Sequence, residues 1–80
     1  MVQETIILKE DLNAIKCANI ANFSRNYTEE NISFIKNDKT LDGHSLFNLF
    51  NLHGKEGEEI IIKIDGPKEE KILRKIKEIL

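Results

Sequence analysis

The sequence has little of what redox chemistry, membrane insertion or binding to a charged polymer requires. Its only cysteine, Cys17, cannot form an internal disulfide. No uninterrupted apolar run is longer than Ile60–Ile62, whereas a membrane-spanning helix needs roughly 20 apolar residues. These absences predict a cytoplasmic protein that does not work in a membrane.

The charges almost cancel, with 12 basic and 14 acidic residues and a net charge of −2. Such a chain has no positive field for nucleic acid, whose binding depends on contacts with phosphates. Its composition, 40% apolar and 32% charged, is that of a globular protein. A chain of 80 residues can bury one modest core, so a single domain, 1–80, is predicted.

Hydrophobic periodicity predicts strands and helices in the order βαββαβα. Alternating apolar residues indicate strands, and apolar residues three or four positions apart indicate helices. The predicted strands are Val2–Lys9, Asn31–Lys36, Thr40–Asp42 and Glu59–Ile64. The predicted helices are Ala14–Tyr27, Ser45–Leu52 and a last one that opens at Pro67. This order fits an α+β fold of two layers, in which the helices cover one face of a four-stranded, mainly antiparallel sheet.

Three segments carry a resemblance to a known family: VQETIILKEDL, LDGHSLFNLFNL and KEGEEIIIKIDG. The second and third match patterns of the type VNAKS-[IL]-[MF]-x-[LV]-x-x-L and KGxxIxIxxxG in both residue type and spacing. The chain thereby resembles the HPr family, the small phosphocarrier proteins of the bacterial sugar phosphotransferase system. The resemblance covers essentially the whole chain and implies that family's open-faced β-sandwich.

In the family, a histidine in the pattern GLHARPAA leads into the first helix and carries a phosphoryl group. An arginine and the helix N-terminus hold the phosphate there. The aligned stretch of this chain is NAIKCANI, which places Ile15 at the histidine and Cys17 at the arginine. Isoleucine has no atom that can accept phosphate. The resemblance therefore implies a divergent member without the family's phosphotransfer site, and neither a catalytic residue nor an enzymatic activity is predicted.

Ser45, at the start of the second predicted helix, has two compatible interpretations. Serine is a preferred N-cap, because its oxygen accepts a hydrogen bond from a backbone N–H of the first turn. The resemblance also pairs Ser45 with the serine that a dedicated kinase phosphorylates in many Gram-positive bacteria. A phosphate at a helix N-terminus is electrostatically favoured. Ser45 is therefore a candidate site of regulatory phosphorylation as well as a cap.

The second predicted helix carries more apolar surface than a core-facing helix needs. Its apolar residues cover roughly 220° around the axis, whereas a core stripe needs a little more than about 100°. If Leu49 and Leu52 face the core, then Leu46, Phe47 and Phe50 lie on the outside, and exposed aromatic clusters mark interfaces. These three residues are predicted to bind a partner. The alternative is that Leu46 or Phe50 lies under a neighbouring loop.

Cys17, His44 and His53 are the remaining groups that could carry chemistry. A thiol near a helix start and beside Lys16 gains thiolate character, but a single cysteine without a mechanistic partner is weak evidence. The spacing of the two histidines matches no metal-ligand motif, so both are interpreted as isolated surface residues. Neither a metal nor a cofactor is predicted.

The leading hypothesis is a monomeric, non-catalytic binding or regulatory module related to the phosphotransferase system. Its partner would be an enzyme, a kinase or a transcriptional regulator of that system. The alternative hypothesis is a phosphocarrier with a non-standard phosphoacceptor such as His44, or a competitor for enzyme I. Uptake of a phosphoryl group on histidine discriminates between them.

Overall fold

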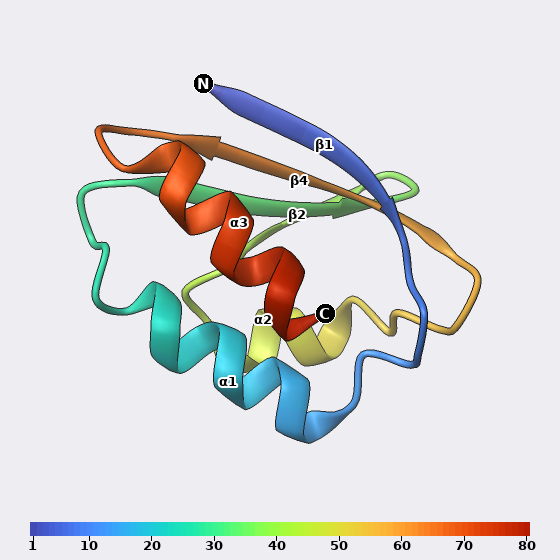
Figure 1. Cartoon of the computed structure of the whole chain (residues 1–80). Coiled ribbons are helices and arrows are strands. Elements are labelled where there is room, and N and C mark those ends of the chain that lie inside the picture. The colour runs from blue at the N-terminus through green and yellow to red at the C-terminus, as the bar shows by residue number, and fades with distance from the viewer.

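The computed structural model describes residues 1–80 and contains four strands and three helices in the predicted order (Figure 1). The strands are β1 (Val2–Ile7), β2 (Asn31–Lys36), β3 (Lys39–Asp42) and β4 (Glu59–Asp65). The helices are α1 (Ala14–Ser24), α2 (Leu46–Asn51) and α3 (Glu69–Ile79). The predicted α+β fold, an open-faced β-sandwich, is confirmed.

One four-stranded sheet, in the order β1-β4-β2-β3, forms the first layer. Every neighbouring pair of strands is antiparallel, and β4 lies between β1 and β2. The register places Ile62 of β4 opposite Glu4 of β1 and Phe34 of β2. All three helices lie on one face of this sheet, and the other face stays uncovered (Figure 1).

The core lies between the sheet and the helices. Alternate residues of β4, namely Ile60, Ile62 and Ile64, are buried because side chains along a strand point to opposite faces in turn. The buried residues that meet them come from all three helices and are Cys17, Ile20, Ala21, Leu49, Ile72 and Ile76. All three helices therefore contribute their apolar faces to one core cluster.

The first helix is shorter than predicted. The prediction extended it to Tyr27, but α1 ends at Ser24 and the chain then tightens into a turn. The N–H of Tyr27 donates to the carbonyl of Ser24 at 2.9 Å, a bond three residues back that does not continue an α-helix. None of the three helices combines the length and the apolar character that crossing a membrane requires.

Candidate functional site

The first turn of α1 presents no nucleophile. Asn13 is the N-cap, and its side-chain oxygen accepts a hydrogen bond from the N–H of Lys16 at 2.9 Å. This capping satisfies one of the backbone donors that a helix N-terminus otherwise offers to an anion. Ile15 follows the cap and is 72% exposed. The exposed surface of this turn therefore includes the aliphatic side chain of Ile15 and the side-chain amide of Asn13.

Cys17 lies inside the core and not on the surface of the α1 turn. The residue is fully buried, and its Sγ is 3.7 Å from the carbonyl oxygen of Leu12. Burial raises the pKa of the Cys17 thiol, because the thiolate would lose its hydration. A protonated, buried thiol is a poor nucleophile. The interpretation of Cys17 as an unreactive residue agrees with this environment.

Ser45 begins α2 as its N-cap. Its backbone is extended, with φ −104° and ψ 121°, and its Oγ accepts a hydrogen bond from the N–H of Asn48 at 3.3 Å. The carbonyl of Ser45 accepts the first helical bond from the N–H of Leu49 at 3.0 Å. Ser45 is half-buried, so its hydroxyl lies at the edge of the surface and at the positive end of a short helix.

The apolar residues of α2 divide between the core and the surface. Leu49 and Leu52 are buried in the core. Phe47 is 79% exposed and Phe50 is 52% exposed. Leu46 is half-buried and packs against the core cluster, so it differs from the two phenylalanines with which the sequence grouped it. The free apolar surface of α2 is therefore carried mainly by two aromatic rings, which we call the α2 aromatic pair, Phe47 and Phe50.

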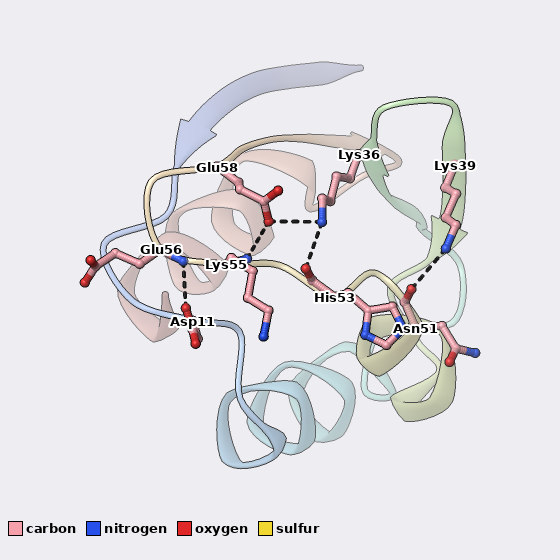
Figure 2. A network of polar contacts seen from close by, with 8 residues as sticks. All are labelled: Asp11, Lys36, Lys39, Asn51, His53, Lys55, Glu56 and Glu58. Atoms are coloured by element: carbon pink, nitrogen blue, oxygen red, sulfur yellow. Dashed lines mark hydrogen bonds and ion pairs between the residues drawn. The ribbon is translucent and has the colours of Figure 1, made fainter.

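Two lysines of the β2–β3 hairpin hold the C-terminal end of α2. Lys39 Nζ donates to the carbonyl of Asn51 at 3.4 Å, and Lys36 Nζ donates to the carbonyl of His53 at 2.8 Å (Figure 2). Lys36 also pairs with Glu58 at 3.0 Å, and this contact lowers the pKa of the Glu58 carboxyl. The last carbonyls of a helix have no partner within it, and cations near them are favourable.

The loop after α2 is tied to the loop before α1. The N–H of Glu56 donates to Asp11 Oδ1 at 2.7 Å (Figure 2). The N–H of Leu12 donates to the carbonyl of Gly54 at 2.9 Å. A Cβ at Gly54 would lie 2.8 Å from Leu8 Cδ1, so the two loops approach at a position where only glycine fits without adjustment. These contacts fix the start of α1 beside the end of α2.

His44 is not an isolated surface residue. Its Nδ1 lies 2.7 Å from Asp42 Oδ1, and its Nε2 lies 2.9 Å from the carbonyl oxygen of Tyr27. The only sequence signal for this arrangement is the spacing Asp42-Gly43-His44, which lets a carboxylate reach a ring two residues away. The structure has no group of three or more histidine, cysteine, aspartate or glutamate residues that could hold a metal ion. His53, the other histidine, is exposed at the end of α2.

The fold is an α+β domain in which three helices cover one face of a four-stranded antiparallel sheet. The family model described as "PTS HPr component phosphorylation site" matches residues 2–80. The chain therefore belongs to the HPr family. Proteins of this family carry a phosphoryl group and interact with protein partners of the phosphotransferase system, rather than catalysing a reaction of their own.

Solved structures show the same architecture. A histidine-containing phosphocarrier protein of Mycoplasma is 26% identical, with a TM-score of 0.88 over 98% of this chain and 90% of that chain. The Bacillus subtilis catabolite repression protein Crh, solved as a domain-swapped dimer, is 25% identical, with a TM-score of 0.76 over 99% of this chain and 92% of that chain. HPr-C-His from Thermoanaerobacter tengcongensis is 20% identical, with a TM-score of 0.87 over 99% and 90%, a likeness of fold alone. No curated protein sequence matches the chain.

Proposed function

We propose that this chain is a non-catalytic HPr-family module that binds a protein partner through α2. The observation that carries the proposal is a contrast between its two helix starts. At α1 the exposed large apolar residue is Ile15, which cannot carry phosphate, whereas at α2 the aromatic pair Phe47 and Phe50 remains on the surface. The module acts as a monomer in the cytoplasm, and its partner is an enzyme, a kinase or a transcriptional regulator of the phosphotransferase system.

Burial favours a different alignment of the chain with the family pattern GLHARPAA. In this correspondence, each position of the pattern falls two residues earlier in the chain than in the alignment made from sequence alone. A leucine precedes the histidine in that pattern, and the buried leucine here is Leu12, whereas Ala14 is exposed. Asn13 then stands at the histidine and Ile15 at the arginine. In this correspondence Cys17 pairs with an alanine, which suits its burial better than an arginine does. Both correspondences leave the chain without the histidine and without the arginine.

The α2 aromatic pair supports docking because exposed aromatic rings are costly to keep in water. Phe47 and Phe50 lie on the same helix three positions apart, so one flat partner surface can cover both. Aromatic residues at the centre of interfaces carry a large share of the binding energy. Leu46, half-buried beside them, is proposed as the inner edge of the same contact.

Ser45 is the proposed regulatory site on this surface. Its Oγ already faces the N–H of Asn48, so a phosphate on it would meet the positive end of α2. Phosphorylation would add negative charge two residues before Phe47 and would change which partners can approach. The relative Crh, whose name refers to catabolite repression, is consistent with a regulatory role for this chain.

The alternative, a phosphocarrier that uses His44, has less support. A phosphoryl group needs a ring nitrogen with a free lone pair, but Nδ1 of His44 faces Asp42 and Nε2 faces the Tyr27 carbonyl. Competition for enzyme I is compatible with docking through α2. A binding titration with enzyme I, described below, tests it.

A reconstituted assay with phosphoenolpyruvate and enzyme I tests the proposal. The wild-type chain is expected to take up no acid-labile phosphate, and stoichiometric uptake would refute the non-catalytic assignment. In a separate binding titration, affinity for enzyme I that falls in Phe47→Ala identifies a competitor docking through α2.

Two matched double variants test the alignment of Asn13 with the family histidine and of Ile15 with the family arginine. Asn13→His with Ile15→Arg changes exposed residues only, so we expect a folded protein with partial phosphoryl acceptance. The control, Ile15→His with Cys17→Arg, places a guanidinium at a fully buried position and should melt at a much lower temperature. A folded Asn13→His, Ile15→Arg protein without any phosphoryl acceptance would contradict the proposed correspondence.

A further inference from the structure

The ring of His44 lies between two groups that can only accept hydrogen bonds. Nδ1 is 2.7 Å from a carboxylate oxygen of Asp42, and Nε2 is 2.9 Å from the backbone carbonyl of Tyr27. A neutral imidazole has one N–H and can therefore donate to only one of them. Only the imidazolium, with an N–H on each nitrogen, satisfies both contacts at these distances.

The ring joins two connections that are far apart in sequence. Asp42 ends β3 and His44 is the residue before Ser45, the N-cap of α2, whereas Tyr27 belongs to the turn between α1 and β2. The backbone N–H of His44 also donates to Asp42 Oδ1 at 3.0 Å, so one carboxylate oxygen holds both the ring and the main chain. Ring protonation thus decides whether the ring can donate to Asp42 and to Tyr27 at the same time.

The backbone next to His44 is packed closely against β2. A Cβ at Gly43 would lie 2.6 Å from Ile32 Cγ2 and 2.8 Å from Phe34 Cε1, so the main chain rests directly on β2. The N–H of Gly43 donates to the carbonyl of Ile32 at 2.7 Å. These contacts hold Gly43 against β2 independently of the charge of His44, so the bonds that depend on this charge are those of the ring.

The charged groups around the ring favour a cation. Asp42 contacts it from β3, and Glu30 acts on it from the α1–β2 connection. Lys68 precedes α3, and its Nζ lies over the Tyr27 ring at 5.8 Å from the ring centroid. The backbone N–H of Lys68 donates to Glu30 Oε2. Burial of the His44 ring disfavours its charge, but the Tyr27 carbonyl and the Asp42 carboxylate outweigh burial and raise the pKa of His44 above 6.5.

We propose that His44 is a proton-dependent clasp, in which the imidazolium ties the entry of α2 to the Tyr27 carbonyl and the neutral ring gives up one of its two bonds. The clasp is defined by His44, Asp42 and Tyr27. It holds whether or not α2 binds a partner, because it rests on the hydrogen-bond geometry alone.

The sign of the pH effect follows from linkage. A group whose pKa is raised by folding contributes its full stability below its unfolded pKa, and this stability is lost as the pH rises through the folded pKa. For His44 the loss therefore begins near 6.5 and is complete above the raised pKa. At the acid end, burial of Asp42 is outweighed by its hydrogen bonds from His44, which lower the pKa of Asp42. The contribution of Asp42 is accordingly lost as the pH falls below 3.8 through its lowered pKa.

Nuclear magnetic resonance of the ring nitrogens tests the clasp directly. The chain has two histidines, so a His53→Gln variant leaves only the His44 ring to observe. We expect both ring nitrogens to be protonated at about pH 6.5, with a titration midpoint above that of an unstructured histidine peptide. A neutral single tautomer at that pH, or a midpoint at or below the peptide value, would overturn the proposal.

Thermal melts of two variants add a readout that does not depend on the resonance assignment. His44→Gln is always neutral, and His44→Lys is always charged near neutral pH. We expect the wild type to melt about 5 °C above His44→Gln at about pH 6 and within about 1 °C of it at about pH 9. The difference in Tm between His44→Lys and His44→Gln should stay the same at these two pH values. A gap between wild type and His44→Gln that does not change with pH would refute the clasp, and should His44→Gln fail to fold, the titration of the His53→Gln protein decides alone.

Discussion

Truncation of the apolar residues of α2 separates a docking surface from a core. Phe47 is 79% exposed, so Phe47→Ala removes little buried area and should change the free energy of unfolding by about 0.5 kcal/mol or less. Phe50 is 52% exposed and should cost about 1 kcal/mol. Leu49 and Leu52 are buried, so cutting either to alanine should cost about 2–5 kcal/mol.

These free energies translate into separated melting temperatures. For a domain of this size, 1 kcal/mol shifts Tm by about 4–8 °C, so the leucine variants should melt at least about 8 °C below the wild type. Phe47→Ala should melt within about 4 °C of the wild type. Differential scanning fluorimetry of the four single variants measures this order before any partner is known. If the phenylalanine variants melt as early as the leucine variants, the aromatic pair belongs to the core and the docking proposal is wrong.

The partner's affinity is the second readout of the same variants. An aromatic residue at the centre of an interface typically contributes 2 kcal/mol or more on truncation to alanine, which is about 30-fold in Kd. Phe47→Ala should therefore weaken binding by about this factor while its melt stays close to the wild type. Unchanged affinity in both phenylalanine variants, measured by calorimetric titration, would place the interface elsewhere.

Three further substitutions test local features of the fold. Ser24→Ala should raise the free energy of unfolding by about 1 kcal/mol, because Ser24 Oγ is buried without a protein hydrogen-bond partner; a lower urea midpoint would contradict this. Ser45→Ala should cost about 1 kcal/mol by removing the cap of the Asn48 N–H, whereas Ser45→Asp should keep most of that stability; equal midpoints for Ser45→Ala and the wild type would show that the cap contributes nothing. Gly66→Ala should cost about 1–3 kcal/mol, since φ is 154° and the new Cβ would lie 3.0 Å from Glu30 Cα; an unchanged thermal melt would refute the steric argument.

The fold could be predicted from sequence because its elements have unambiguous periods. Alternation at Ile60, Ile62 and Ile64 marks β4 as a strand with one buried face, and the structure buries all three side chains. The end of α1 could not be predicted, because Tyr27 continues the apolar spacing of the helix but lies in the turn that follows it. A half-buried aromatic residue packs against the core equally well from a helix or from a turn.

The candidate site was less predictable, because its features depend on contacts between distant segments. The aromatic character of Phe47 and Phe50 was visible in the sequence, but their exposed fractions depend on how α2 rotates over the sheet. The role of Lys36 at the end of α2 could not be foreseen, since its carbonyl partner is 17 positions away along the chain. His44 binds the Tyr27 carbonyl across the same separation.

The pairing of β1 with β4 has a consequence for how the chain folds as it is synthesised. Val2 pairs with Ile64, so the first strand has no neighbour in the sheet until Glu59–Asp65 has left the ribosome. The β2–β3 hairpin is the only strand pair that neighbouring segments can form earlier. Pairings this distant in sequence are slow, because the chain must close a long loop before it gains their contacts. A nascent chain that stops before Glu59 therefore lacks β4, the strand between β1 and β2, and these two strands remain open to pairing with other chains.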